Sequence, residues 1–331
     1  MVRPAVTVLT PTLNAEQFLS PMLTSLREQT LDPSKVEHIV IDAGSKDGTV
    51  ERIHRESPST RIITAKSSIY EAMNIGLHEA QGECIGWLNA DDLWSPDALA
   101  SVARTLEARP ESALVIGDYE MFDGTRRFHY ETHEDVLARI REGRMRRWFD
   151  VWVNPLALFY RTDFLREMGG YDPSYRLVGD WDLWFRAAAK GASVHVAHTG
   201  STLGSFRMHP GSLTSGTRMD RLFEEKRRAM ARWISDGGAP AGLRECARRM
   251  YRHDTLSLMA VRSRGASAPE WIAMMRELGR ELRAAGDGLS GDFATASMMA
   301  AHELCQSLPG VGTLARAAWA ATGGPRVSSN E

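Results

Sequence analysis

The sequence has few cysteines, no strong excess of either charge and no long apolar run. Its three cysteines, Cys84, Cys246 and Cys305, are scattered and show no C-x-x-C spacing. We therefore expect buried free thiols in a reducing compartment, not a disulfide framework or a metal site. The formal net charge of −2 gives no reason to expect a general nucleic-acid binder. No stretch reaches the about 18 apolar residues of a spanning helix, and residues 1–14 are too polar for a signal peptide.

Several motifs that identify common nucleotide-binding or hydrolytic enzymes are also missing. The first predicted strand is not followed by G-x-G-x-x-G, and the chain has no G-x-x-x-x-G-K-[ST], which argues against a dinucleotide-dependent dehydrogenase and a P-loop protein. It also lacks G-x-S-x-G, the turn that carries a nucleophilic serine. What remains is an ordinary soluble composition, 43% hydrophobic and 25% charged, in 331 residues. That length suits one large domain with an extension, or two domains.

The first third of the chain alternates between strand and helix patterns. Predicted strands cover residues 5–12, 36–42, 61–65 and 84–88, and predicted helices cover 18–26, 49–57, 68–82 and 95–110. Pro21 interrupts the first helix, whose regular part is expected to begin there. Gly82 is expected to cap the third helix, and Ser95 the fourth. This alternation predicts an α/β fold with a mostly parallel sheet flanked by helices.

Polar clusters follow three of these strands. They are residues 10–14, 42–47 and 89–92. In a parallel sheet, ligands bind beyond the carboxyl ends of the strands. We therefore expect the three clusters to converge on one site.

The pattern changes along the rest of the chain. Residues 113–122 resemble a strand, 157–175 a strand, helix and turn, and 179–197 a helix followed by a strand. From Met219 onward strand patterns end, and helical segments are separated at 236–242, 263–270 and 286–291. We place a domain boundary near residue 218, with an α/β domain at 1–218 and a helical extension at 219–331.

Two adjacent carboxylates, Asp91 and Asp92, directly follow the fourth predicted strand. Buried like charges repel unless a cation lies nearby. One interpretation is local capping of the next helix, and the other is a divalent metal, since Mg²⁺ and Mn²⁺ favour oxygen ligands and often share them with substrate phosphates. Asp42 is equally open between a turn former and a hydrogen-bond acceptor for a nucleobase or ribose. Asp47 favours turn chemistry.

Further candidates lie downstream. Asp180 starts a predicted helix, where it caps the helix or acts as a general base; neighbouring Asp182 is expected only to cap. His209 lies in a predicted loop near Arg207. The two are either ordinary structural residues or a metal ligand and a diphosphate contact.

The basic run Arg141, Arg144, Arg146 and Arg147 favours a solvated helix face. The alternative is attraction to an anionic lipid surface or a phosphate-bearing acceptor.

In order, these segments resemble those of the family 2 glycosyltransferases, which have the GT-A fold. The resemblance covers residues 5–215. It rests on five segments: "VTVLTPTLN", "VIDAGSKDGT", "IYEAMNIGLHEAQGECIGWLNADD", "GDWDLWFR" and "RMHPGSLT". Each segment is weak alone, and the ordered set is specific.

The resemblance implies an inverting transferase that uses a nucleotide-diphosphate sugar with Mn²⁺ or Mg²⁺. Thr12 and Asp42 would contact the base or ribose, and Asp91 the ribose or the metal-bound diphosphate. The metal ligand would be Asp92, with His209 touching metal or diphosphate beside Arg207. Asp180 would accept the proton of the acceptor hydroxyl.

Some positions depart from the family pattern. Lys66 and Ser68 replace an Asp and a Gly, Ile75 replaces a Lys, and Gly179 replaces the Glu of an E-D pair. These changes bear on donor-sugar contacts more than on the chemistry. The Q-x-x-R-W of processive synthases is absent, which favours addition of a single sugar to a saccharide or lipid-linked acceptor.

Two alternatives remain open: an inactive nucleotide-sugar-binding or scaffold protein, and a sugar nucleotidyltransferase. We expect a cytoplasmic protein, peripheral at the inner face of the cell membrane or free of it. Residues 219–331 are expected to cover the acceptor side of the site, to form a homodimer or to lie on a membrane surface. Their stretch 308–322 is apolar enough for membrane contact, but ordinary core packing is favoured.

Overall fold

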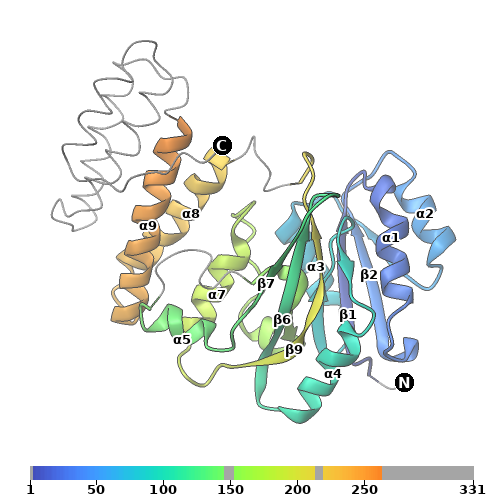
Figure 1. Cartoon of the computed structure of the whole chain (residues 1–331), viewed down its shortest axis with the longest axis horizontal. Coiled ribbons are helices and arrows are strands. Elements are labelled where there is room, and N and C mark those ends of the chain that lie inside the picture. Colours follow the sequence, from blue (N-terminus) through green and yellow to red (C-terminus); the bar gives the residue numbers. More distant parts are fainter. Residues whose placement is uncertain (1–2, 145–152, 213–218, 263–331) are drawn as a thin grey trace, which may run out of the picture. The chain divides into compact units, whose positions relative to one another are not determined.

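The computed structural model describes residues 3–144, 153–212 and 219–262 (Figure 1). The strands are β1 (Val6–Thr12), β2 (Val36–Asp42), β3 (Arg61–Thr64), β4 (Cys84–Trp87), β5 (Leu93–Trp94), β6 (Ser112–Phe122), β7 (Arg127–Tyr130), β8 (Leu158–Arg161) and β9 (His195–Arg207). The α-helices are α1 (Glu16–Arg27), α2 (Thr49–Glu56), α3 (Ile69–Glu79), α4 (Ala98–Ala108), α5 (Val136–Arg141), α6 (Thr162–Glu167), α7 (Gly179–Ala189), α8 (Met219–Ser235) and α9 (Ala241–Arg262). Two short 3₁₀ helices, η1 (Pro33–Lys35) and η3 (Pro155–Ala157), precede β2 and β8.

One sheet joins all of these strands in the order β3-β2-β1-β4-β8-β6-β9-β5, and β7 pairs with β6. The segment β3-β2-β1-β4 is parallel, which agrees with the strand–helix alternation of the first third of the chain. Beyond it the sheet is mixed, because β8 runs antiparallel to both β4 and β6. Two antiparallel steps restore the direction, so β6 and β9 run parallel to β4. The carboxyl ends of β1, β2, β4, β6 and β9 therefore lie at one edge.

The helices bury their apolar faces on this sheet. In α3, Tyr70, Met73 and Leu77 are buried, and Ser68 forms a capping box with Glu71 at its start. The wider core gathers apolar side chains from β1, β2, β4, β6, β8 and β9 with those of α1 and α4. The α/β prediction is thus confirmed, with a sheet that is wholly parallel from β3 to β4 and mixed beyond β4.

Three local expectations, at Pro21, Ser95 and Gly82, are wrong. Pro21 lies inside α1, which begins at Glu16, because the buried face of α1 stabilises the turns on both sides of the proline. Helix α4 begins at Ala98 with Asp97 at the N-cap, and Ser95 instead accepts the backbone N–H of Ala98 through its carbonyl at 3.0 Å.

Gly82 does not cap α3, which ends with Ala80 in an extended conformation. It meets β1 instead: a Cβ at this position would lie 2.5 Å from the backbone nitrogen of Thr7. The Gly82 N–H donates to Thr7 Oγ1 at 2.9 Å. Glycine is therefore required here for close backbone approach.

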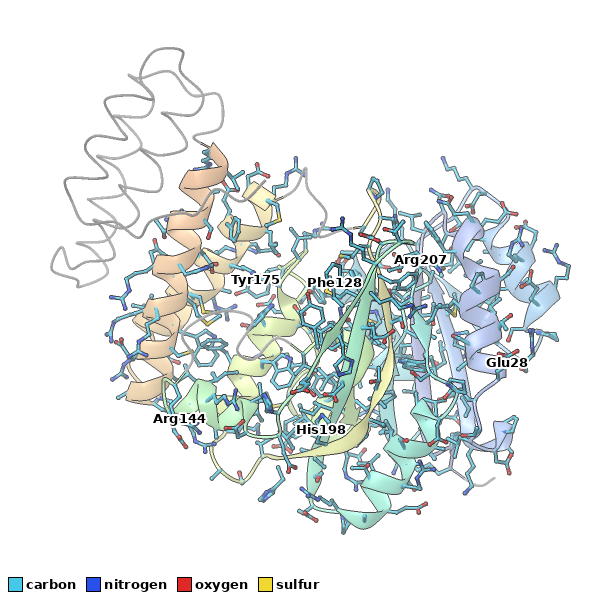
Figure 2. All side chains as sticks on the ribbon, in the orientation of Figure 1. Glu28, Phe128, Arg144, Tyr175, His198 and Arg207 are labelled. Carbon is cyan, nitrogen blue, oxygen red and sulfur yellow. The ribbon has the colours of Figure 1, made fainter. Side chains whose placement is uncertain are left out.

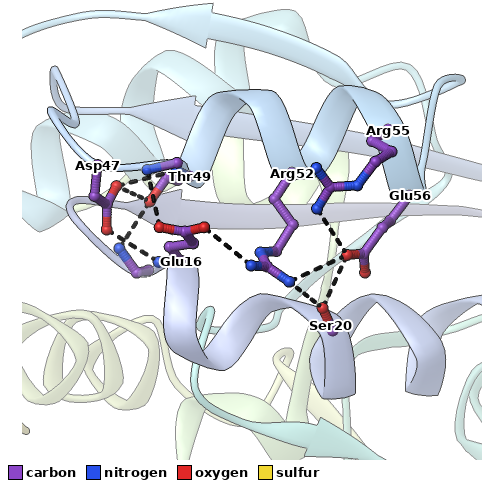
Figure 3. A network of polar contacts seen from close by, with 9 residues as sticks. Glu16, Ser20, Asp47, Thr49, Arg52, Arg55 and Glu56 are labelled. Carbon is purple, nitrogen blue, oxygen red and sulfur yellow. Dashed lines mark hydrogen bonds and ion pairs between the residues drawn. The ribbon is translucent and has the colours of Figure 1, made fainter.

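A polar network fixes α1 against α2 and the loop between β2 and α2 (Figure 3). Arg52 donates to Glu16 at 2.9 Å and to Ser20 at 3.0 Å. Asp47 accepts the backbone N–H of Glu16 at 3.2 Å and that of Thr49 at 3.1 Å. Asp47 is thus a turn-forming residue, as expected, and the network holds the loop that follows Asp42.

Cys84 and Cys246 are buried and form no disulfide among the described residues, as expected, and Cys305 lies outside those residues. Of the basic run expected on a solvated helix face, Arg141 is the last residue of α5 and pairs with Glu142. Arg144 follows the end of that helix and pairs with Asp135 and Glu142; Arg146 and Arg147 are not described. In the described ranges, no helix is both long and apolar enough to span a bilayer.

Helices α8 and α9 confirm the helical pattern that follows Met219, and the segments at 263–270, 286–291 and 308–322 lie outside the described residues. The chain divides into two compact units, 1–216 with 232–247, and 217–231 with 248–331. The last four residues of α8 and the start of α9 thus belong to the first unit. The domain boundary near residue 218 stays a prediction.

Candidate active site

The loop after β4 meets the end of β9 at the shared edge of the sheet. Asp91 Oδ2 lies 2.9 Å from His209 Nε2, and the Asp91 carbonyl accepts a hydrogen bond from Arg207 Nε at 3.0 Å. The side chains of Asp91 and His209 are 22% and 19% exposed, so both are partly open to solvent. The sheet topology therefore brings together Asp91, Arg207 and His209, three of the predicted site residues.

Aromatic rings hold this cluster in place. The Arg207 guanidinium carbon lies 4.6 Å from the centre of the Phe122 ring and 5.9 Å from that of Phe18. The His209 ring packs against Phe18 with centroids 4.6 Å apart. Figure 2 shows Arg207 and His198 near opposite ends of β9, with Arg207 at the edge where β1 and β2 end.

Asp92 contacts the backbone of this cluster at Arg207. Its side chain is buried, and its two oxygens accept hydrogen bonds from the Arg207 backbone N–H and from Asn89 Nδ2, each at 2.9 Å. Burial, reinforced by the adjacent Asp91 charge, raises the pKa of Asp92 well above its usual range. Neither carboxylate caps α4, whose N-cap is Asp97. Of the pair, Asp91 is the one that could share a cation with His209.

Thr12 and Asp42 lie opposite each other in the β1–β2 register, and Thr12 Oγ1 donates to Asp42 Oδ1 at 3.1 Å. Asp42 also accepts the backbone N–H groups of Gly44 at 3.0 Å and Ser45 at 2.9 Å, and the Ser45 hydroxyl at 2.5 Å. Four hydrogen bonds fill the acceptor capacity of a carboxylate. Asp42 therefore shapes the turn that follows β2, and a direct contact with a nucleotide stays a prediction.

Asp180 lies in the first turn of α7 beside a group of aromatic residues. Tyr70 donates its hydroxyl to Asp180 Oδ1 at 3.2 Å. The Tyr70 ring stacks on Tyr171 with centroids 5.5 Å apart and meets Trp87 edge-on at 6.1 Å. Asp180 also lines a cavity, whose other lining residues are Met73, Ile85, Trp87, Pro155, Leu158, Tyr160 and Tyr171.

The aromatic group also connects to the carboxylates that follow β4. Trp87 Nε1 donates to Asn89 Oδ1 at 2.6 Å, and Asn89 Nδ2 donates to Asp92. Asn89 belongs to the predicted cluster at 89–92, whereas Tyr70 and Trp87 are not singled out by the sequence, because aromatic residues on apolar faces indicate core packing. The signal that could have found Tyr70 is its place in "IYEAMN", one of the segments that carry the family resemblance.

The expectation for Asp182 is wrong. Its buried carboxylate pairs with Arg186 Nε at 2.7 Å inside α7, four residues along the same helix. Arg186 also donates to the carbonyl of Gly170 at 2.7 Å. Asp182 therefore anchors α7 to the preceding turn and does not cap the helix.

The donor set at Asp91 and His209 suits a hard or borderline divalent cation, since it offers one carboxylate and one imidazole. Within residues 3–144, 153–212 and 219–262, no group of three or more His, Cys, Asp or Glu residues is arranged to hold a metal ion. An ion with few protein ligands takes the rest from water and substrate phosphates, as Mg²⁺ commonly does. The residues present fit such a cation.

The family model for glycosyl transferase family 2 matches residues 7–166. A PGL/p-HBAD biosynthesis glycosyltransferase of Mycobacterium tuberculosis is 30% identical over 200 residues, which cover 59% of this chain and 73% of that protein. The uncharacterized glycosyltransferase YwdF of Bacillus subtilis is 30% identical over 186 residues, covering 55% and 68% of the two chains.

Solved structures share the fold. The S. aureus TarS fragment 1–349 in complex with UDP-GlcNAc superposes with a TM-score of 0.62 at 17% identity, covering 82% of this chain and 80% of that one. The mannosyltransferase PcManGT of Pyrobaculum calidifontis, in complex with GDP-Man and Mn²⁺, gives a TM-score of 0.56 at 18% identity, covering 92% and 86%. This chain belongs to glycosyltransferase family 2 and is a glycosyltransferase with the GT-A fold.

Proposed function

We propose that the protein transfers a sugar from a nucleotide-diphosphate sugar to an acceptor hydroxyl, with inversion and with a divalent metal. The observation that carries this proposal is the meeting of Asp91, His209 and Arg207 where β4 and β9 end. A carboxylate, an imidazole and a guanidinium at one edge match a cation bound to a diphosphate. The donors named for TarS and PcManGT, UDP-GlcNAc and GDP-Man, support the donor class.

In this proposal Asp91 and His209 hold the ion, in place of the Asp92 assigned from the resemblance. Asp92 instead fixes the backbone of Arg207, whose N–H it accepts. A bound Mn²⁺ or Mg²⁺ would supply Lewis-acid stabilisation to the departing diphosphate. Arg207 would contact the diphosphate, and Thr12 with the Asp42 turn would face the nucleoside.

Asp180 is the proposed base. The acceptor oxygen forms a bond to the anomeric carbon while the Asp180 carboxylate takes its proton. The bond from that carbon to the diphosphate oxygen breaks, and the nucleoside diphosphate leaves with the electron pair. A base at the first turn of a helix is held rigidly, and the aromatic wall beside it would exclude water.

The acceptor class rests on the relatives. One is named for PGL/p-HBAD biosynthesis. Another, the O-antigen biosynthesis protein RfbC of Myxococcus xanthus, is 28% identical over 265 residues, which cover 76% of this chain and 20% of that protein. We propose a saccharide or lipid-linked acceptor of the cell envelope, receiving a single sugar. Residues 219–331 would cover the acceptor side, form a homodimer or contact the cytoplasmic membrane face. The carboxylates placed at both parts of the site favour this activity over the scaffold and nucleotidyltransferase alternatives.

The test is thermal stability with a panel of UDP-, GDP- and dTDP-sugars, each with Mn²⁺ or with EDTA. A ligand that binds only the native state raises the melting temperature. We expect one nucleotide to stabilise the protein and the shift to require Mn²⁺. If no donor gives a metal-dependent shift, the proposal is wrong.

A further inference from the structure

Gly179 and Tyr70 are packed so closely that a side chain on one would displace the other. A Cβ at Gly179 would lie 2.8 Å from Tyr70 Cε2 and 2.9 Å from Cδ2 and Cζ. These three atoms belong to a rigid ring that is itself held by Tyr171 and Trp87. The absence of a side chain at Gly179 therefore leaves the space that the Tyr70 ring fills.

In this position the Tyr70 ring places its hydroxyl beside Asp180, the residue that follows Gly179. The hydroxyl donates to Asp180 Oδ1 at 3.2 Å. Tyr70 is 4% exposed, and burial raises the pKa of its phenol well above 10, with the Asp180 charge acting in the same direction. The phenol therefore stays protonated and keeps donating at any pH used in an assay. A hydrogen bond to an ionised carboxylate is among the stronger ones in proteins.

We infer that Tyr70 is a positioning residue for the reaction. By its hydrogen bond it holds the Asp180 carboxylate in the orientation that receives the acceptor proton, and Gly179 makes this contact possible. The inference rests on the proposed role of Asp180 as the base. Tyr70 lies in α3 and Asp180 in α7, so the bond also ties the base to the helix that packs on β1 and β2.

The test compares Tyr70→Phe with Tyr171→Phe. Tyr171 belongs to the same buried cluster and stacks on the same ring, but its hydrogen bonds to Asn74 use its backbone N–H and carbonyl. Both variants thus lose one buried phenol, and only Tyr70→Phe loses a hydrogen bond to the base. Melting temperatures of the two show whether either variant is unfolded.

The donor is chosen from UDP-GlcNAc, UDP-glucose and GDP-mannose as the one that stabilises the wild type in the presence of Mn²⁺. The readout is the release of nucleotide from this donor. A misplaced catalytic group lowers the rate without changing donor binding. We expect Tyr70→Phe to lower kcat about 10- to 100-fold with the donor KM within about twofold, and Tyr171→Phe to stay within about twofold in both. Equal losses in the two variants, or a loss confined to KM, would overturn the inference.

Gly179→Ala is a second, independent variant, because it keeps the phenol and displaces the ring. We expect its kcat to fall as in Tyr70→Phe, and the double variant to lose no more than the larger single loss, since both act through one contact. Additive losses would contradict a shared contact. Crystal structures give a readout without substrate: the Asp180 side chain should change rotamer in Tyr70→Phe and keep it in Tyr171→Phe.

Failure of the proposed function has a different signature. If the wild type shows no metal-dependent donor binding, the site assignment itself fails, whatever Tyr70 does. A different set of results would refute the positioning role alone. In that case the wild type releases nucleotide, the Asp180→Asn variant does not, and the Tyr70→Phe variant releases it as fast as the wild type.

Discussion

Asp91 Oδ2 and His209 Nε2 lie 2.9 Å apart although 118 positions separate the two residues in the sequence. The contact exists because β9 runs parallel to β6, and β6 has the direction of β4 across the inserted strand β8. The end of β9 therefore reaches the loop that follows β4. A carboxylate and an imidazole at this distance either pair with each other or share a cation.

The first prediction separates the two adjacent carboxylates. Asp91→Asn and His209→Ala should each weaken Mn²⁺-dependent donor binding by at least about tenfold, because each removes a proposed ligand. Asp92→Asn should keep the metal dependence, since its oxygens are directed to Asn89 and the Arg207 backbone. Titration calorimetry of the donor with Mn²⁺ and with EDTA measures both effects. Loss of the metal dependence in Asp92→Asn alone would restore Asp92 as the ligand.

The second prediction concerns the base. Asp180→Asn should lower kcat by about 10²- to 10⁴-fold, because a neutral amide cannot take the acceptor proton. Donor binding and melting temperature should change little. Asp182→Asn provides the contrast, since it breaks a buried ion pair with Arg186 and should lower the melting temperature instead. If transfer survives undiminished in a folded Asp180→Asn protein, the base assignment is wrong.

The third prediction tests the geometry of Arg207 apart from its charge. Arg207→Lys keeps the positive charge but loses the Nε–H bond to the Asp91 carbonyl and the planar contact with Phe122. We expect donor affinity to fall about tenfold, which corresponds to about 1.4 kcal/mol. Arg127→Lys is the matched control, because Arg127 also lies over Phe122, at 5.2 Å, but pairs with Glu120. A comparable loss in both would assign the effect to ring packing and not to the diphosphate.

The sequence predicted those features of the fold that depend on local periodicity. The alternation of strands and helices through residue 108 and the strand-end clusters at Asp42 and Asp91 follow from side-chain patterns that repeat every two or 3.6 residues. The insertion of β8 between β4 and β6 cannot be predicted from such patterns, because strand order depends on contacts between distant segments. The resemblance implies a metal role for Asp92, and that role stays a prediction; the different burial of Asp91 and Asp92 cannot be read from two adjacent carboxylates in the sequence.

The aromatic side of the site shows the same limit. Tyr70 and Trp87 have the spacing of core residues, and they are indeed buried. The Tyr70 hydroxyl donates to Asp180, which lies far along the chain, and the Trp87 indole N–H donates to Asn89, in the loop after β4. Neither partner can be inferred from the position of the ring in the sequence. Hydrophobic patterning identifies the buried face of an element and carries no information about the polar atom at the end of a buried ring.

The last prediction is a pH dependence of stability that arises at His38, on β2. Its ring lies between Thr10 Oγ1, 3.1 Å from Nε2, and Thr60 Oγ1, 2.9 Å from Nδ1, and burial lowers its pKa to about 4. The unfolded chain takes up this proton near pH 6.5, and the folded protein does so only near pH 4. Between these values the unfolded state binds more protons, so stability falls as the pH drops from about 6.5 to about 4, by up to about 3 kcal/mol.

Urea unfolding at pH 7.5, 6, 5 and 4.5 measures this fall in the free energy of unfolding. The wild type should show it, and so should the control variant His54→Gln, because the His54 side chain is exposed. His38→Gln should flatten it, and an unchanged slope in that variant would show that other groups cause the loss.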